Sequence, residues 1–202
     1  MTATMWDSEI FAEAGGPESA APACPAAGTV PPPADPRLLR QAFGTFATGV
    51  VALTYRAGGS DYGVTVNSFT SVSLDPPLLL VSMQRTSRAL SHLLERPFAV
   101  NVLAEGQLDT ALNFAGKPQP RPVDWVRGEA APRVGGALAY FQCTPWASYD
   151  GGDHVLVLGR VTDFGQRDDV QPLLFHRGQW NIAGNTAESR AGDGAQPERN
   201  RA

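Results

Sequence analysis

Cysteine is nearly absent from this chain: its 202 residues include only Cys24 and Cys143, which lie far apart. They form no C-x-x-C pair, so neither a zinc site nor a disulfide framework is expected. No apolar run approaches the roughly 18 residues of a membrane-spanning helix. The first residues also lack the positive and apolar regions of a signal peptide. We therefore predict a cytoplasmic protein with no metal site and no membrane contact.

The chain has no excess of positive charge, since its formal net charge at pH 7 is −4. Such a balance gives no electrostatic reason to expect binding to nucleic acid. Three signatures are also missing: the G-x-S-x-G nucleophile elbow, the H-E-x-x-H metal motif and the G-x-G-x-x-G dinucleotide loop. If the protein is an enzyme, we expect its reactive group to come from a cofactor, which asks the protein mainly for binding and orientation.

Large apolar side chains are scarce at both ends of the chain. Residues 1–35 contain six prolines and nine alanines, and residues 184–202 have alanine as their only apolar side chain. Such segments bury too little surface to offset the entropy of ordering, so we expect both tails to be disordered. One folded domain is expected between them, over 36–183.

The domain is predicted to be mainly β with peripheral helices, because many strands are joined by short turns. Apolar spacing predicts helices over about 36–49, 87–94 and 106–115, the first with Leu38, Leu39, Ala42, Phe43 and Phe46 on one face. Strands are predicted at 50–55, 62–67, 78–83, 98–103, 137–149, 154–164, 173–175 and 179–182. Residues 117–136 read as a long loop. The pattern favours a β-barrel.

Small polar side chains cluster after the predicted strand 62–67. They are Thr65, Asn67, Ser68, Thr70, Ser71 and Ser73. The polar face of a half-exposed strand would give the same composition, and that alternative stays open. However, Asn67 and Ser68 are adjacent and Phe69 follows them, which breaks the two-residue period and predicts a bend. Amides and hydroxyls at a bend suit the polar edge of a flat heterocycle.

A second polar segment lies between the strand 78–83 and the helix 87–94. Ser82, Arg85 and Ser87 combine hydroxyls and a guanidinium with helix-terminal amides, which favours an anion site, although simple helix capping is the alternative. Later, a Gly-Gly turn precedes Asp153 and His154. Adjacent residues of a strand point to opposite faces, so we expect that Asp153 and His154 cannot pair as an Asp–His catalytic dyad. The turn can still place His154 at the rim of a pocket.

Several motifs occur in an order that resembles a known family. They are G-V-T-V-N-S-F-T-S-V-S-L-D-P-P-L-L-L-V-S, F-A-V-N-V-L-A, N-F-A, G-A-L-A-Y-F-Q-C, G-D-H and P-L-L-F-H-R-G. Together, over about residues 38–183, they resemble the flavin reductase-like domain, specifically the short-chain reductase component of two-component flavin-dependent monooxygenases. The resemblance implies a split β-barrel of the FMN-binding type, a homodimer, and reduction of FMN or FAD by NADH or NADPH for a partner monooxygenase.

The resemblance also implies roles for individual residues. Contacts to the flavin ring and ribityl chain would come from Thr65, Val66, Asn67, Ser68 and Ser71. Ser82, Arg85 and Ser87 would hold the phosphate, and the corner Asn113, Phe114 and Ala115 would close the site. His154 and Arg177 would lie where the nicotinamide approaches. Two positions depart from the family: Val66 stands where alanine is frequent, and His176 where tyrosine is frequent.

Two other functions remain open from the sequence. A flavoprotein with tightly bound flavin could act directly on an organic substrate, or a non-catalytic flavin-binding module could serve as a carrier. The chain has no long apolar insert that would lock a flavin in place. This favours a reductase whose flavin diffuses away after reduction.

Overall fold

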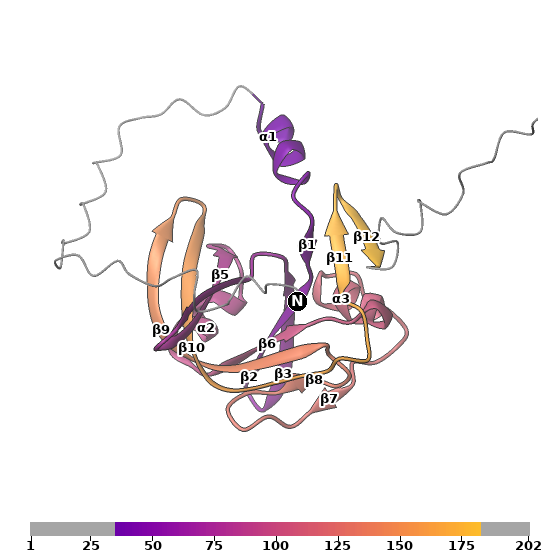
Figure 1. Cartoon of the computed structure of the whole chain (residues 1–202). Coiled ribbons are helices and arrows are strands. Elements are labelled where there is room, and N and C mark those ends of the chain that lie inside the picture. The colour runs from indigo at the N-terminus through magenta and orange to yellow at the C-terminus, as the bar shows by residue number, and fades with distance from the viewer. Residues whose placement is uncertain (1–34, 183–202) are drawn as a thin grey trace, which may run out of the picture. The chain divides into compact units, whose positions relative to one another are not determined.

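The computed structural model describes residues 35–182. The tails predicted over 1–35 and 184–202 lie outside the described residues, apart from Asp35. Within the described residues, seven antiparallel strands make the main sheet, in the order β3-β2-β6-β9-β10-β5-β4 (Figure 1). They are β2 (Val51–Ala57), β3 (Ser60–Val66), β4 (Thr70–Leu74), β5 (Pro77–Gln84), β6 (Phe98–Val102), β9 (Ala139–Gly151) and β10 (His154–Gln166).

Two smaller sheets and a few helices complete the described part. One sheet joins β1 (Thr48–Gly49), β11 (Leu173–His176) and β12 (Gln179–Ile182), and the other pairs β7 (Trp125–Val126) with β8 (Arg133–Val134). The helices are α1 (Pro36–Phe43), α2 (Ala89–Glu95) and α3 (Leu108–Phe114), the last preceded by a 3-10 turn over Glu105–Gln107. The prediction of a mainly β fold with peripheral helices is therefore confirmed.

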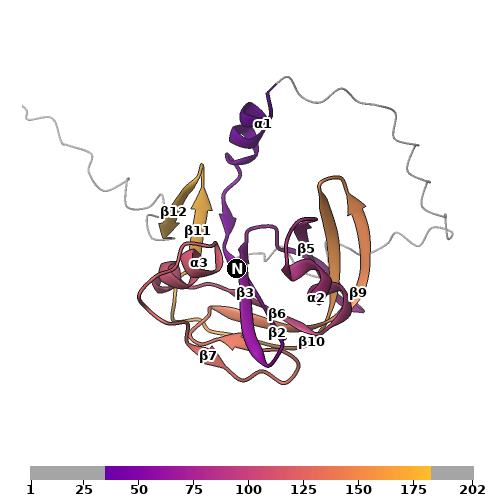
Figure 2. The ribbon, with the colours of Figure 1, turned by 180° about the vertical axis from the view of Figure 1, so that it is seen from behind.

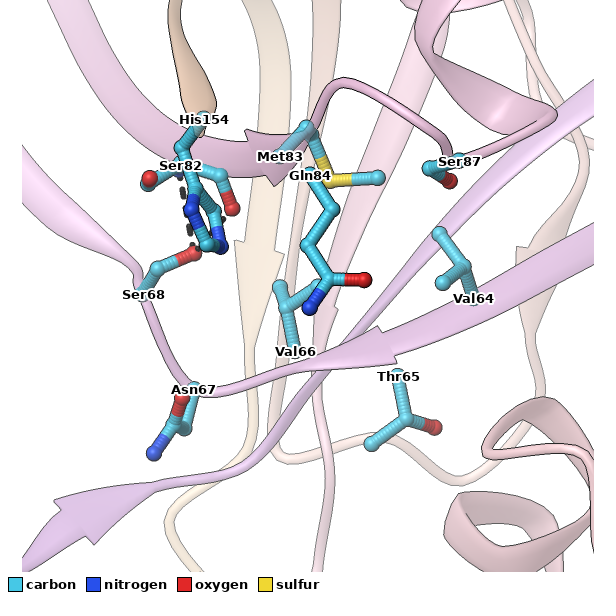
Figure 3. Close-up of a pocket in the computed structure, with 10 residues that line it drawn as sticks. All are labelled: Val64, Thr65, Val66, Asn67, Ser68, Ser82, Met83, Gln84, Ser87 and His154. Atoms are coloured by element: carbon cyan, nitrogen blue, oxygen red, sulfur yellow. Dashed lines mark hydrogen bonds between the residues drawn. The ribbon is translucent and has the colours of Figure 1, made fainter. Parts of the chain in front are cut away.

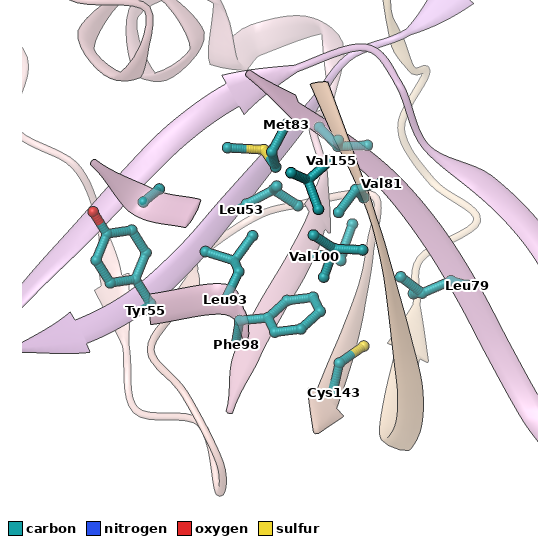
Figure 4. Close-up of a cluster of buried hydrophobic side chains, with 13 residues drawn as sticks. Leu53, Tyr55, Leu79, Val81, Met83, Leu93, Phe98, Val100, Cys143 and Val155 are labelled. Atoms are coloured by element: carbon teal, nitrogen blue, oxygen red, sulfur yellow. The ribbon is translucent and has the colours of Figure 1, made fainter. Parts of the chain in front are cut away.

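The core lies where the sheet curves around α2. Leu53, Val81, Phe98 and Val100 on its strands are fully buried, and Leu93 of α2 packs into the same cluster (Figure 4). Burying each such side chain stabilises the fold by roughly 1.5–3 kcal/mol. Seen from behind, the sheet again encloses α2 (Figure 2). Strands β3 and β4 are the two ends of the sheet order, so hydrogen bonding does not close the barrel, as the split-barrel prediction requires.

Strand β4 was not predicted as a strand. Its five residues, T-S-V-S-L, are mostly small and polar, and they pair with β5 on one side only. An edge strand exposes its other side to water, so it needs no alternating apolar pattern. The register also shifts between Ser71 and Ser73, which further obscures the period.

The first helix is shorter than predicted. It ends at Phe43, whereas the sequence favoured a stop at Gly49. Gly49 instead belongs to β1 and pairs with Leu174 of β11. The Thr45 hydroxyl donates to the carbonyl of Ala42 and caps the end of the helix. Helix α1 also buries none of its residues: its large apolar side chains remain exposed, as does Phe46 just after it.

The long loop over 117–136 is held to the sheet by buried side-chain amides. The Gln142 oxygen accepts the N–H groups of Ala130 and Ala131, at 3.0 and 2.8 Å. The Asn101 oxygen accepts the N–H of Val134 at 2.9 Å. Both amides are fully buried. Buried polar groups are almost always paired, so these amides fix the course of the loop.

Replacing Gln142 by leucine keeps the volume but removes these hydrogen bonds. We expect Gln142→Leu to lower the free energy of unfolding by roughly 2–4 kcal/mol, because the buried groups of Ala131 lose their partners. Urea denaturation measures this loss. Gln171→Leu, at an exposed position, is the control and should change little; an equally stable Gln142→Leu protein would show that the loop is held by other contacts.

Candidate functional site

A pocket of about 320 Å³ lies where the ends of β3 and β5 meet the start of β10 (Figure 3). Its volume falls within the range of roughly 300–1,000 Å³ found for small-molecule sites. The lining residues are Val64, Thr65, Val66, Asn67, Ser68, Ser82, Met83, Gln84, Ser87 and His154. The structure thus brings together residues from both polar segments and the histidine turn.

The pocket exists because the chain bends after β3. At this bend the Ser68 hydroxyl accepts the N–H of Ser82 at 3.0 Å and donates to the carbonyl of Ser82 at 2.9 Å. One side chain therefore satisfies both backbone groups of a β5 residue. The ring of Phe69 stacks on Phe141, with centroids 5.7 Å apart, and anchors the other side of the bend. The predicted bend is present.

Residues 65–67 also line a second hollow of about 180 Å³. Its other walls are Val50, Ala115, Phe175 and Trp180. The Thr65 hydroxyl donates to the carbonyl of Ala111 at 2.8 Å, which ties β3 to α3. The end of β3 therefore separates two hollows, and of the corner predicted at the end of α3 only Ala115 lines either one.

Arg85 does not line the pocket. Its Nε donates to the carbonyl of Gly152 at 2.7 Å, and its guanidinium pairs with the carboxylate of Asp150 at 2.7 Å. The Gly152 N–H, and after it the Arg85 guanidinium, hold the pKa of Asp150 below its ordinary value. Arg85 thus braces the turn between β9 and β10, which delivers His154 to the pocket.

The expectation that Asp153 and His154 cannot pair is wrong. His154 Nδ1 lies 2.7 Å from Asp153 Oδ1, and this hydrogen bond holds the pKa of Asp153 below its ordinary value. Strand β10 begins at His154, so Asp153 belongs to the turn. The alternation of faces applies only within a strand. His154 lines the same pocket as the paired Ser68 and Ser82 (Figure 3).

Besides Arg85, four predicted residues lie outside both linings. Ser71 is exposed on the edge strand β4. Arg177 is exposed in the turn between β11 and β12, where its backbone N–H donates to the carbonyl of Gly44 at 2.8 Å. Asn113 and Phe114 lie at the end of α3. The flavin-binding roles of all four stay predictions.

The end of α3 has structural contacts of its own. The Asn113 amide donates to the carbonyl of Arg121 at 3.2 Å and holds the first part of the long loop. The Phe114 ring lies against Gly63 of β3, where a Cβ atom would come within 2.6 Å of the ring. It also packs against Trp125, with centroids 5.6 Å apart. Glycine at 63 is therefore required for α3 to approach β3.

Sequence reasoning missed three lining residues, Val64, Met83 and Gln84. Two of them had a signal: Val64 shares a face of β3 with Val66, and Gln84 shares a face of β5 with Ser82, since side chains alternate along a strand. In Figure 3, Gln84 points into the space between Val66 and Ser87. Met83 is only 2% exposed.

The pocket combines two kinds of surface. Val64, Val66 and Met83 provide an apolar wall, while Asn67 and Gln84 provide amides at the rim. Sites for flat organic ligands have this mixture of an apolar wall and a few polar groups. In the described range 35–182, no group of His, Cys, Asp or Glu side chains could hold a metal ion. No helix in that range is long and apolar enough to cross a membrane.

A family model described as the flavin reductase-like domain matches residues 43–184. The chain belongs to this family. A probable flavin reductase of Rhizobium meliloti strain 1021 is 47% identical over 149 residues, which cover 71% of this chain and 48% of that protein. The chain thus spans about half the length of that relative.

Two further relatives match over most of their length. The reductase subunit HsaB of a flavin-dependent monooxygenase from Rhodococcus jostii strain RHA1 is 38% identical over 151 residues, covering 72% of this chain and 77% of the subunit. The NADH:FAD oxidoreductase SgcE6 of Streptomyces globisporus C-1027, solved with NAD and FAD fragments, is 36% identical, with a TM-score of 0.70. That match covers 80% of this chain and 99% of SgcE6. The predicted family, fold and enzyme class, a flavin reductase, are confirmed.

The contact between Ser68 and Ser82 can be tested directly in this flavin reductase family member. We expect Ser68→Ala to lower the free energy of unfolding by about 1–2 kcal/mol, because both backbone groups of Ser82 lose a partner. It should also weaken flavin binding, since the bend after β3 loosens. Thermal melting and a fluorescence titration with FMN measure the two effects. Ser148→Ala, at an exposed position, is the control. An unchanged melting temperature of Ser68→Ala would show that this hydrogen bond does not hold the bend.

Proposed function

We propose that the protein uses NADH or NADPH to reduce FMN or FAD, which then diffuses to a partner flavin-dependent monooxygenase. The pocket at the bend after β3 carries this proposal, because it joins an apolar wall to a polar rim and His154. Supporting it, SgcE6 is named as an NADH:FAD oxidoreductase and was solved with NAD and FAD fragments. HsaB is named as the reductase subunit of a flavin-dependent monooxygenase.

The chain's residues would act mainly by positioning. The apolar side chains of Val64 and Val66 would contact the face of the flavin, and the amides of Asn67 and Gln84 would bind its polar edge. The flavin supplies the redox chemistry by accepting a hydride from the nicotinamide. Such transfers gain most of their rate from holding the two reactants in the right orientation, which requires no acid–base pair.

The polar residues around this wall would hold the rest of the ligands. The Ser82 and Ser87 hydroxyls face the same pocket and would bind the flavin phosphate. Arg85, which pairs with Asp150 outside the pocket lining, would add positive charge near the phosphate. His154, oriented by Asp153, would contact the nicotinamide.

We further propose a homodimer, whose second copy would complete the site. Leu38 and Phe43 of α1 and the following Phe46 are 63%, 71% and 77% exposed. Apolar side chains exposed together on one face commonly mark a protein interface. In this arrangement, Ser71, Asn113, Phe114 and Arg177 would approach the flavin of one or the other copy.

The folded domain over 36–183, flanked by disordered tails, and a cytoplasmic location remain part of the proposal.

The function is tested by mixing the purified protein with NADH or NADPH, with and without FMN or FAD, and following the absorbance of the reduced nicotinamide. We expect oxidation only when flavin is added, since the flavin is a diffusing substrate. The four combinations identify both cofactors. Protein that purifies yellow and oxidises no nicotinamide with any pair would contradict the proposal and favour a carrier or a substrate-specific flavoenzyme.

The same assay examines the role of His154. His154→Ala should lower kcat or raise the KM for nicotinamide, because the imidazole no longer contacts it, while the Kd for flavin changes little. His92→Ala removes a histidine outside the pocket that stacks on Tyr55 and serves as the matched control. Wild-type kinetics for His154→Ala would remove this residue from the site.

The homodimer is tested by sedimentation velocity. We expect wild-type protein to sediment as a dimer and the double variant Leu38→Ser, Phe43→Ser to shift towards the monomer, because the apolar face of α1 is lost. A double variant at Val72 and Leu74, also exposed but on the edge strand β4, controls for general loss of apolar surface. A wild-type monomer at micromolar concentration would contradict the dimer.

A further inference from the structure

A third hollow, of about 400 Å³, lies away from the flavin pocket. We name it the β8 pocket, and its lining residues are Val126, Arg133, Val134, Gly135, Gly136, Ala137, Tyr140, Gly165, Gln166 and Arg167. Strands β9 and β10 each run for 13 residues, so about 40 Å of strand separates its Gln166 from His154 at the flavin pocket. The two pockets therefore lie at opposite ends of the same hairpin.

Arg133 is held in a fixed orientation in the β8 pocket. Its guanidinium lies 3.8 Å from the centroid of the Tyr140 ring, a cation–π contact that sets the plane of the group. Tyr140 is itself fixed against Gly165, where a Cβ atom would come within 2.7 Å of its ring. In the described part of the chain, the buried Nε of Arg133 has no hydrogen-bond partner.

The charges around the pocket leave Arg133 uncompensated. Its neighbour Arg167 pairs with Asp169 through two contacts, at 3.0 and 2.7 Å, and this hydrogen bonding holds the pKa of Asp169 below its ordinary value. Asp124 lies against Gly135, but over residues 35–182 no carboxylate forms an ion pair with Arg133. One oriented cation is therefore available to an anion that enters the pocket.

We propose that the β8 pocket binds a small organic carboxylate with an apolar body. The carboxylate would pair with the Arg133 guanidinium, whose planar donors match its geometry. Val126, Ala137 and the ring of Tyr140 line the same pocket and offer apolar surface to the rest of the ligand. One uncompensated cation matches a single negative charge, and the volume exceeds what inorganic phosphate would fill.

Benzoate is the probe that tests this site, with benzamide as its neutral counterpart. Titrations of the full-length, ¹⁵N-labelled protein contain excess FMN. The FMN occupies the flavin pocket, so benzoate cannot bind there. We expect benzoate to shift the amide signals of Gly135, Gly136 and Gly165 in a saturable way, and benzamide and inorganic phosphate to bind at least tenfold more weakly. Shifts confined to the flavin pocket, or equal binding of benzamide or phosphate, would overturn the proposal.

Variants assign the binding to the guanidinium. Arg133→Gln should weaken benzoate at least tenfold, while Arg133→Lys keeps the charge and should lose less. Arg160→Gln is the matched control, since Arg160 lies over the exposed ring of Trp146 on the same hairpin and outside the pocket. Wild-type affinity in Arg133→Gln would overturn the assignment. Melting curves verify that each variant folds, and the benzoate–benzamide comparison decides with wild-type protein alone if one does not.

Discussion

The fold and the site both depend on one side chain, the hydroxyl of Ser68, which bonds both backbone groups of Ser82. Strands β3 and β4 are the two edges of the main sheet, and the residues between them must cross from one edge to the other. A continuous strand would have formed backbone hydrogen bonds with Ser82 of β5 and would have left no room for a pocket. Because a side chain makes the bonds instead, the backbone turns away, and the pocket opens between the bend, β5 and the start of β10.

The β9–β10 turn supplies the other side of this pocket through the exposed pair of Arg85 with Asp150 and the hydrogen bond between Asp153 and the half-buried His154. Exposed ion pairs contribute little to stability, so both contacts serve mainly to orient groups. Both carboxyls have lowered pKa values. Their contribution is therefore present above the ordinary pKa of about 3.8 and is lost as pH falls through the lowered values. At neutral pH both contributions are present, and the turn keeps His154 in place.

The sequence predicted those features that depend on neighbours along the chain. Adjacent glycines such as Gly58 and Gly59 favour a tight turn, and both adopt positive φ, 55° and 81°. The bend at Asn67 and Ser68 was visible as a break in alternation. The role of Arg85 was not visible, because its partner Gly152 lies 67 residues away. An arginine between a strand and a helix looks the same whether it binds a phosphate or braces a distant turn.

Buried amides show the same limit in another form. Asn101 and Gln142 lie within strands, where a polar side chain ordinarily indicates an outward face, yet both are fully buried. Each side-chain amide can both donate and accept hydrogen bonds. Here the two amides accept the backbone N–H groups of Ala130, Ala131 and Val134, which a neighbouring strand would otherwise bind. This anchoring fixes β8 and with it Arg133, at the opposite end of the hairpin from His154. Polar side chains that pair with backbone thus shape both pockets: Ser68 at the bend after β3, and Asn101 and Gln142 beside the β8 pocket.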